Sequence, residues 1–481
     1  MIPKEVIERI GEYEWEIPKH FRSDMRVPAR FFASEEMLPQ VLKDKALLQL
    51  VNVATLPGIQ GYALAMPDIH EGYGFPIGGV AAMDVEEGVV SPGGIGYDIN
   101  CGVRILTSQV SFKEVAEHIE ALANLVFQYV PAGVGKGGKF KLSKKEIKKV
   151  LETGVRWALD NEMATDSDLP YIESKGQLPN ADPDAVSSIA IERGSDQLGT
   201  MGSGNHFVEI QIVEKIFEPE IAKDFGLFEG QVVFMIHTGS RGLGHQVATD
   251  YIKLMVANLK KWGIDLPDRE LACAPISSPE GQRYITAMNA AANFAFTNRQ
   301  LITHQLRKAW KQVMGSAGGQ LRILYDVAHN IAKIETYEVN GKKKQVLVHR
   351  KGATRSFGPH HHEIPSQYRS SGQPVLIPGS MGTASYVLAG TETSYSKSWG
   401  TTCHGAGRQM SRRKARESVN ASELIKDLDK QGIIVKAHSK KGVTEEAPLA
   451  YKDVDQVVEV VDKVGIARRV ARLRPWAVIK G

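Results

Sequence analysis

A short glycine-rich segment of the sequence places an acid and a thiol close together. In the segment 96–104 (GYDINCGVR), Asp98 and Cys101 are three residues apart. A carboxylate and a thiolate both bind divalent transition metals, and a thiolate has enough lone pairs to bridge two ions. The segment therefore predicts a metal site, provided that other parts of the chain supply nitrogen ligands.

Three histidines are candidates for those nitrogen ligands. His206 opens a strand-like run after a glycine-rich turn, while His237 and His329 close the strand-like runs VVFMIH and LRILYDVAH. A histidine at a strand end is commonly a hydrogen-bonded structural residue, and that alternative stays open for each of them. Strand ends are also where a rigid scaffold presents functional side chains. Together with Asp98 and Cys101 the three histidines make five ligands, more than one tetrahedral ion needs, and two neighbouring ions suit phosphoryl chemistry.

His404 is the candidate nucleophile. It lies in the segment 403–408 (CHGAGR), where small neighbours allow close approach to its ring. One interpretation is a glycine-rich turn with an incidental histidine. The other is attack of this histidine on a phosphorus atom, with backbone amides and Arg408 stabilising the developing charge. The upstream segment 378–383 (PGSMGT) is a candidate phosphate-binding loop.

Helical and strand-like patterns along the whole chain must position these residues. Apolar residues at intervals of three and four predict helices, and short apolar runs predict strands. We expect helices at 36–49, 113–130, 143–164, 246–263, 280–314, 406–417 and 420–430, and strands at 206–214, 231–237, 321–329, 345–350 and 374–379. Because the two types are interspersed, we predict an α+β (mixed α/β) fold. It would be a single compact body of mixed sheets surrounded by helices, with residues 1–481 as one catalytic domain and the metal site at strand ends.

The composition narrows the class of protein. The 481 residues are 42% hydrophobic and 24% charged, which is ordinary for a globular chain with a large core. No apolar run is long enough to span a membrane and the N-terminus lacks the pattern of a signal peptide, so we expect a cytoplasmic protein. Three cysteines argue against a disulfide framework. The net charge is only +4, but basic residues cluster at 136–149, 342–344, 408–416 and 468–474, as solvated surface or as contacts for a polyanion.

Six motifs occur in an order that resembles the RtcB family of RNA-splicing ligases. They are GYDINCGVR, GSGNHFVE, IHTGSRGLGH, DVAHN, PGSMGTASYVL and CHGAGR. The similarity runs from the DIHEGYGFPIGG segment at 68–79 to Lys480. The resemblance implies a GTP-dependent RNA ligase with two manganese ions. Such an enzyme joins an RNA ending in a 2',3'-cyclic phosphate or 3'-phosphate to an RNA with a 5'-hydroxyl.

The resemblance also implies a role for each site residue. One manganese ion would be held by Asp98, Cys101 and His206, and the second by Cys101, His237 and His329, with Cys101 bridging. His404 would take GMP from GTP as a phosphoramidate, and transfer of this GMP to the RNA 3'-phosphate would supply a leaving group. The guanylate-binding positions would be Asn205, His206, Phe207, Val208, Glu209, His329, Asn330, Pro378, Gly379, Ser380, Met381, Ser385, His404, Gly405, Ala406, Gly407, Tyr451 and Lys480.

Other interpretations stay open at the level of the sequence. A binuclear metal-dependent cyclic phosphodiesterase would need the metal ligands but neither His404 nor GTP. A non-catalytic RNA-binding protein would need only the basic clusters, and its affinity would fall with salt. Without the resemblance, Lys480 would be a solvated chain end and Tyr451 a half-buried tyrosine.

Several properties are not fixed by the sequence. These are the physiological RNA, the oligomeric state and the RNA-docking surface. For the RNA, we expect tRNA halves first. The run His360–His362 has no assigned role, because adjacent residues of an extended segment cannot all reach one ion. An activator of the archease family is implied by the resemblance alone.

Overall fold

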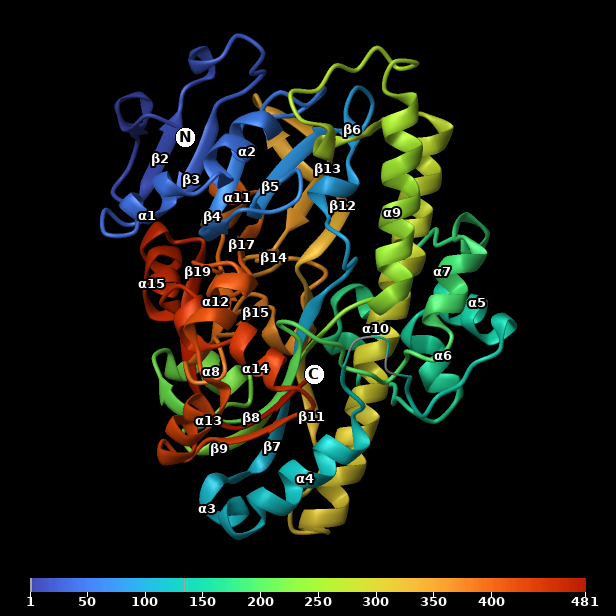
Figure 1. Ribbon diagram of the computed structural model, residues 1–481, viewed down its shortest axis with the longest axis vertical. Helices are drawn as coiled ribbons and strands as arrows, with labels where there is room; N and C mark the ends of the chain where they lie inside the picture. The colour runs from blue at the N-terminus through green and yellow to red at the C-terminus, as the bar shows by residue number, and fades with distance from the viewer. Residues whose placement is uncertain (1, 134, 136) are drawn as a thin grey trace.

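Two large β-sheets and a group of long helices build the molecule (Figure 1). The computed structural model describes residues 2–481 apart from residues 134 and 136. Helices and strands alternate along the chain and one hydrophobic cluster reaches into both sheets, which confirms the predicted α+β class. Among the described residues, no helix combines the length and the apolar character that crossing a membrane requires.

The first sheet has seven strands in the order β1-β2-β3-β4-β5-β13-β12. Its strands are β1 (Glu8–Arg9), β2 (Glu14–Ile17), β3 (Ala29–Phe32), β4 (Ala63–His70), β5 (Ile77–Asp84), β12 (Asn330–Val339) and β13 (Lys342–Lys351). The ladder between β4 and β5 is interrupted between Ala65 and His70. Such an interruption leaves backbone groups to be satisfied from outside the sheet.

The second sheet carries most of the predicted site residues. Its strands follow the order β11-β7-β9-β8-β19-β16-β15, and β18 pairs with β19. They are β7 (Gly102–Ser111), β8 (Phe207–Ile216), β9 (Gln231–Thr238), β11 (Arg322–Ala328), β15 (Pro374–Ile377), β16 (Ser385–Gly390), β18 (Ile434–Ala437) and β19 (Ala467–Lys480). Two small sheets pair β6 (Val89–Val90) with β10 (Ala274–Pro275) and β14 (Ala353–Arg355) with β17 (Thr401–Cys403). The central strand β19 has no counterpart among the predicted strands, because its arginines hide the alternation of buried residues.

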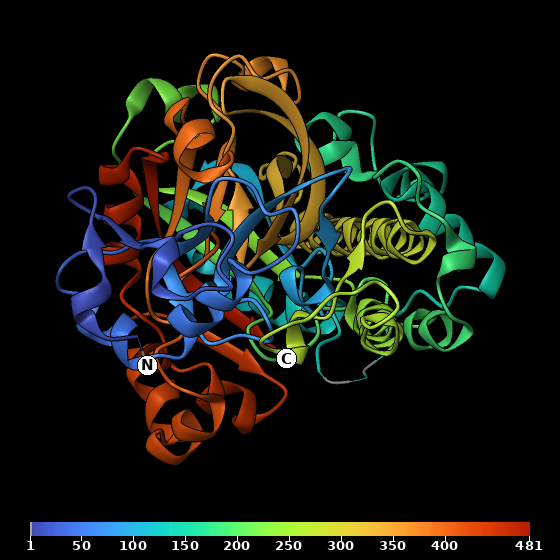
Figure 2. The same ribbon diagram turned by 90° about the horizontal axis from the view of Figure 1, so that it is seen from above.

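Long helices cover one side of the second sheet. α9 (Arg241–Asn258) and α10 (Pro279–Met314) pack against each other, and α5 to α7 lie on their outer side in both views (Figures 1 and 2). The middle of α10 is buried nearly all round, and its alanines allow this close packing. The remaining helices are α1 (Leu38–Lys43), α2 (Ala46–Val53), α3 (Phe112–Val115), α4 (Ile119–Tyr129), α5 (Lys144–Thr153), α6 (Val155–Asp160), α7 (Ser188–Gly194), α8 (Pro219–Asp224), α11 (Thr393–Ser398), α12 (Arg412–Ser418), α13 (Ala421–Lys430), α14 (Lys440–Glu445) and α15 (Val454–Val464).

Four predicted helices are divided or begin later than expected. The segment 113–130 forms α3 and α4, which a 3-10 turn at Ala116–His118 separates. The segment 36–49 forms two helices, and 143–164 is broken at Gly154, where φ is +56°. The segment 406–417 is helical only from Arg412, because residues before it form a turn that packs on the backbone of Asp68. Periodicity alone does not reveal such breaks, since the apolar spacing continues across them.

Candidate metal centre and nucleophile

The ends of four neighbouring strands meet at the candidate metal centre. Cys101 immediately precedes β7, His206 immediately precedes β8, and His329 immediately follows β11. His237 is the penultimate residue of β9, which pairs with both β7 and β8. The antiparallel order β11-β7-β9-β8 therefore brings ligands from distant parts of the sequence side by side.

A buried arginine on α10 holds these strand ends in place. Arg299 donates to the carbonyl oxygen of Asn100 at 2.8 Å and to that of Thr238 at 2.9 Å. Its guanidinium also pairs with the Asp326 carboxylate, with Nε to Oδ2 at 2.8 Å. Because the three partners are close in sequence to Cys101, His237 and His329, one side chain fixes the relative position of three ligand-bearing segments.

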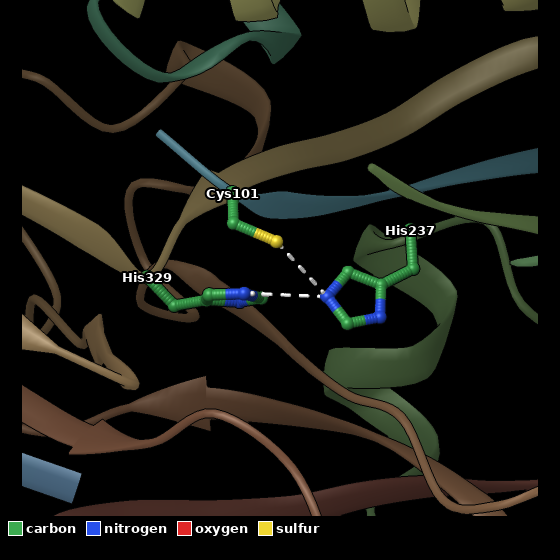
Figure 3. A group of neighbouring side chains, drawn as sticks. All are labelled: Cys101, His237 and His329. Atoms are coloured by element: carbon green, nitrogen blue, oxygen red, sulfur yellow. Dashed lines mark hydrogen bonds between the residues drawn. The ribbon is translucent and has the colours of Figure 1, made fainter. Parts of the chain in front are cut away.

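The five predicted ligands form two groups that share Cys101. One group is Asp98, Cys101 and His206, and the other is Cys101, His237 and His329, with all ligand atoms of a group within 4.8 Å of one another. The Cys101 Sγ lies 3.4 Å from Nε2 of His206 and 3.4 Å from Nε2 of His237. Figure 3 shows the Cys101 thiol and the His329 ring directed at the same nitrogen of His237, which is 3.3 Å from the His329 Nε2.

These separations fit ligands that share an ion. Two atoms bound at about 2.0–2.3 Å to one tetrahedral ion lie roughly 3.3–3.6 Å apart. Burial lowers the pKa of His237 and of His329 well below the ordinary value, so both rings are neutral, which is the form that binds metals. Burial disfavours the charged form of Asp98, but the hydrogen bond and charge of His206 keep its pKa below the ordinary value. The two groups therefore offer donors for two divalent ions, with Cys101 common to both. Burial raises the pKa of the Cys101 thiol, so ion binding there would have to displace its proton.

His404 is held by a carboxylate that the sequence analysis did not assign. The Asp68 Oδ2 lies 2.6 Å from the His404 Nδ1 and accepts from the His404 backbone N–H at 3.1 Å. A carboxylate accepts, so it fixes the proton on Nδ1 and leaves a lone pair on Nε2. The ring centroid of His404 lies 4.9 Å from that of the metal-ligand candidate His329. The nucleophile candidate is therefore oriented and adjacent to the metal centre.

A cavity of about 220 Å³ unites the metal centre, His404 and most of the predicted guanylate-binding positions. The predicted residues that line it are Asp98, Cys101, Asn205, Phe207, Glu209, His237, His329, Asn330, Pro378, Gly379, Ser380, Met381, His404, Gly405, Ala406, Gly407, Tyr451 and Lys480. Lining residues that the sequence analysis missed include His70, Gly352, Arg412 and Glu446. Of these, His70 lies in the segment 68–79, which is part of the resemblance, and Asp68 lies two residues before it. Their signal was a carboxylate and a histidine in an otherwise apolar, glycine-rich run.

Three predicted positions lie outside the lining of this cavity. His206 borders a second cavity of about 470 Å³, which Asp98 also lines. The side chain of Val208 is fully buried in the sheet, where it pairs with Ile479. Ser385 is buried behind the 378–381 loop, and its hydroxyl accepts from the Gly379 N–H at 3.1 Å. Ser385 thus supports the candidate phosphate loop from behind.

Lys480 lies inside the molecule and not on a solvated tail. It is the last residue of β19, where it pairs with Phe207, and its ammonium donates to the carbonyl oxygen of Gly204 at 3.0 Å. Tyr451 is also enclosed: its hydroxyl donates to Glu446 and accepts from Arg408 at 3.2 Å. Figure 1 shows the C-terminal end of the chain near the middle of the molecule. Lys480 borders the cavity because β19 crosses the second sheet, whereas Tyr451 borders it beside Arg408, with which it forms an isolated β-bridge.

The four basic clusters have different surroundings. The 468–474 cluster lies in β19, where Arg469 pairs with Asp462 and Arg472 with Glu214, so its charge is largely neutralised within the protein. The 408–416 cluster contributes Arg408 and Arg412 to the cavity. The 342–344 cluster forms the start of β13, where it pairs with the end of β12. Of the 136–149 cluster, Lys136 lies outside the described residues.

The fold and the site define a class of protein with a candidate two-ion centre beside a carboxylate-held histidine. Residues 49–481 match a family model described as tRNA-splicing ligase RtcB. The chain is 53% identical to the tRNA-splicing ligase RtcB of Thermococcus kodakarensis, covering 100% of this chain and 99% of that one. It is 54% identical to that of Aeropyrum pernix over 98% of this chain and 99% of the relative, and 51% identical to that of Archaeoglobus fulgidus over 99% of each. The chain belongs to the RtcB family.

Proposed function

We propose that the protein is a GTP- and Mn²⁺-dependent RNA ligase. It joins RNA 2',3'-cyclic phosphate or 3'-phosphate ends to 5'-hydroxyl ends through a histidine–GMP intermediate, in tRNA splicing and RNA repair. The observation that supports this function best is the placement of His404, fixed by Asp68, on the same 220 Å³ cavity as both ligand groups. A metal-dependent phosphodiesterase without GTP would not require this histidine, because its ions would activate the water and the phosphate.

In the proposed first step, His404 attacks the α-phosphorus of GTP. A bond forms from Nε2 to phosphorus, the bond from phosphorus to the bridging oxygen of the leaving group breaks, and pyrophosphate departs. The proton on Nδ1 stays in its hydrogen bond to Asp68, whose carboxylate stabilises the positive charge that develops on the ring. Where the RNA ends in a 2',3'-cyclic phosphate, water first breaks the bond from phosphorus to O2' and leaves a 3'-phosphate. An oxygen of the 3'-phosphate then takes GMP as the bond from phosphorus to Nε2 breaks. The 5'-hydroxyl attacks the 3'-phosphorus, loses its proton to solvent, and displaces GMP as the strands join.

The cavity offers groups that suit guanine and its phosphates. Glu209 is buried, and this burial raises its pKa to about 7. A carboxyl group placed there can accept hydrogen bonds from the N–H groups of a guanine ring, while the Lys480 ammonium lies nearby. The 378–381 loop and Arg408 border the same space, and backbone N–H groups and a guanidinium are common phosphate ligands. We assign the guanylate to this cavity.

The donor set supports the choice of Mn²⁺ over Mg²⁺, while the choice of Mn²⁺ among transition metals rests on the family resemblance. Bound ions would neutralise phosphate charge and align the reacting oxygens. Asp98, Cys101, His206, His237 and His329 would hold them. Mg²⁺ prefers an oxygen shell, whereas imidazole and thiolate suit transition metals, so Mn²⁺ is the better match.

The second cavity is the proposed approach for RNA. It is lined by Asp98 and His206 of the candidate metal centre and by Arg193 and Arg241, with Glu192 and Asp196 also on its wall. Guanidinium groups suit the phosphates of an RNA end. We extend the proposal to tRNA halves as substrates and to an archease-family activator on the family resemblance alone.

Incubation with Mn²⁺ and GTP labelled at the α-phosphate tests the proposal. We expect label on the denatured wild-type chain through an acid-labile, alkali-stable bond, and none on His404→Ala. His118→Ala, a change at an exposed histidine outside the cavity, should label like the wild type. Absence of label from a metal-loaded wild type would overturn the guanylylation mechanism and favour the metal-dependent phosphodiesterase.

A further inference from the structure

Lys452 is a buried lysine with no place among the residues that line the guanylate cavity. Only 8% of it is exposed. Burial lowers its pKa to about 8, although attraction to Asp68 and Asp44 opposes this effect. An ammonium group is costly to bury unless its donors find acceptors, so the contacts of Lys452 indicate what its burial achieves.

The ammonium of Lys452 contacts the backbone on both sides of Asp68. Its Nζ donates to the carbonyl oxygen of Pro67 at 3.2 Å and to that of Ile69. These carbonyls lie where the ladder of β4 is interrupted: pairing with β5 is irregular from Ala65 to His70. Pairing with β3 extends only to Ala65. Lys452 therefore satisfies backbone groups that neither neighbouring strand reaches.

The backbone of Lys452 bonds to the turn that follows His404. Its N–H donates to the carbonyl oxygen of Gly407 at 2.9 Å, in the turn that follows His404. This turn lies directly on β4, since a Cβ added to Gly407 would be 2.3 Å from the Asp68 carbonyl oxygen. One residue thus bonds both to the strand that carries the carboxylate and to the turn that carries the nucleophile.

Lys452 also places a positive charge near the Asp68 carboxylate, which has few hydrogen-bond partners of its own. Asp68 is fully buried, and its Oδ1 has no hydrogen-bond partner among the described residues. Its Oδ2 bonds only to the ring and the backbone of His404. A buried carboxylate in this situation gains from a nearby ammonium group, because the ionised form is the one that accepts from Nδ1.

We propose that Lys452 is a positioning residue for His404, acting through Asp68 by clamping the carbonyls of Pro67 and Ile69. The clamp fixes the direction of the Asp68 carboxylate, and the carboxylate fixes the tautomer and direction of the imidazole. This inference rests on the proposed function for its catalytic consequence, while the arrangement of the three residues stands independently of it.

A double-mutant cycle on the full-length protein tests the proposal. The variants are Lys452→Met, Asp68→Asn and the two combined, and the readout is the initial rate of GMP attachment per folded molecule. We expect Lys452→Met to slow attachment about 10- to 100-fold, the range typical of outer partners that orient a functional side chain. The double variant should be no slower than Asp68→Asn alone, because both changes remove the same constraint. The proposal would be overturned if the rate reductions of the two single variants multiplied in the double variant. It would also be overturned if Lys452→Met attached GMP at the wild-type rate.

Two further measurements keep the proposal falsifiable. Lys452→Arg retains the charge and the donors and should recover most of the rate, and Lys452→Gln replaces Lys452→Met if the latter fails to fold. The rate at which diethylpyrocarbonate modifies His404, measured by peptide mass spectrometry without GTP, reports its nucleophilicity directly. We expect this modification rate to fall in Lys452→Met. An unchanged rate would show that Lys452 has no effect on His404. If the wild type reacts with diethylpyrocarbonate but takes no label from GTP, the proposed function fails while this comparison still decides the role of Lys452.

Discussion

At the scale of single residues, the site depends on which nitrogen of His404 is free. Asp68 accepts from Nδ1 and from the backbone N–H of the same histidine, so the ring has one orientation and one tautomer. The His404 ring lies beside that of the metal-ligand candidate His329. The chemistry proposed for His404 thus depends on a carboxylate that is 336 residues away in the chain.

Asp68→Asn tests this dependence. The amide can donate to Nδ1 and so favour the wrong tautomer, and we expect GMP attachment to fall by about 10³- to 10⁴-fold. The metal content, measured by elemental mass spectrometry, should stay at the wild-type level, because Asp68 belongs to neither ligand group. Asp24→Asn, a change in a surface ion pair, is the matched control and should label normally. Normal labelling of Asp68→Asn would contradict the assigned role.

Glu209 predicts a pH dependence of stability. Burial raises its pKa from 4.5 to about 7, so the folded chain binds one more proton than the unfolded chain between these pH values. Its stabilising contribution is full below about pH 4.5 and lost as the pH rises through about 7, a difference of about 3 kcal/mol. Urea unfolding of the metal-free protein should show a smaller fall in stability over this range for Glu209→Gln than for wild type. Glu338→Gln, at an exposed position, should keep the wild-type slope.

At the scale of elements, the turn after β17 brings the nucleophile onto β4. Gly407 has φ +74°, and a Cβ there would lie 2.3 Å from the Asp68 carbonyl oxygen. Behind the neighbouring 378–381 loop, a small apolar cluster that includes Met381, Leu428 and Val478 joins α13 and α14 to the second sheet. Packing of these short elements, and not any single strand, closes the cavity around His404.

A comparison of Gly407→Ala with Gly432→Ala distinguishes two effects of an added Cβ: the clash with the Asp68 backbone and the strain of a positive φ. Gly432 also has a positive φ, +75°, but a Cβ there would meet nothing within 4 Å. Gly432→Ala should therefore cost only the conformational strain, roughly 1 kcal/mol in thermal or chemical unfolding. Gly407→Ala should destabilise more and should also lower GMP attachment per folded molecule, since the turn must move away from Asp68. Equal effects of the two changes on both readouts would refute the importance of the close approach.

At the scale of the whole molecule, the candidate metal centre joins segments that are far apart in the chain. Its ligands come from the ends of β7, β8, β9 and β11, with α10 fixing three of these segments through Arg299. Ions that bind there bind the folded state and not the unfolded chain, so they stabilise the entire fold.

Metal removal should therefore lower the melting temperature. At a free Mn²⁺ concentration of 100 times the dissociation constant, each site adds about 2.7 kcal/mol to stability. A chelator should destabilise the wild type and Cys273→Ser, whose thiol is buried outside both ligand groups. Cys101→Ser removes the shared ligand and should bind less metal and respond little to the chelator. An equal response of both variants in differential scanning calorimetry would rule out Cys101 as the bridge.

The sequence by itself predicted the α+β class, helix α10, the strands β8, β9 and β11, and the candidate metal ligands that the structure brings together. Those inferences rest on local signals, namely apolar periodicity, glycine-rich turns and residue types that bind metals. The sequence did not predict the strands β4, β7, β17 and β19, which also border the site. The roles of the guanylate-binding positions came from the family resemblance, and they stay predictions.

Only the tertiary structure showed the partners of His404. Asp68 bonds to His404, and Lys452 bonds to the backbone on both sides of Asp68 and to the turn after β17, because β4 of the first sheet lies against that turn. The residue types at 68–70 are a local signal, but local spacing does not show which distant residue they contact. The structure likewise placed Lys480 inside the second sheet, since the pairing of β19 with β8 is a long-range contact. Local spacing specifies which elements form, whereas the packing of distant elements decides which polar groups share a buried environment and so how they act.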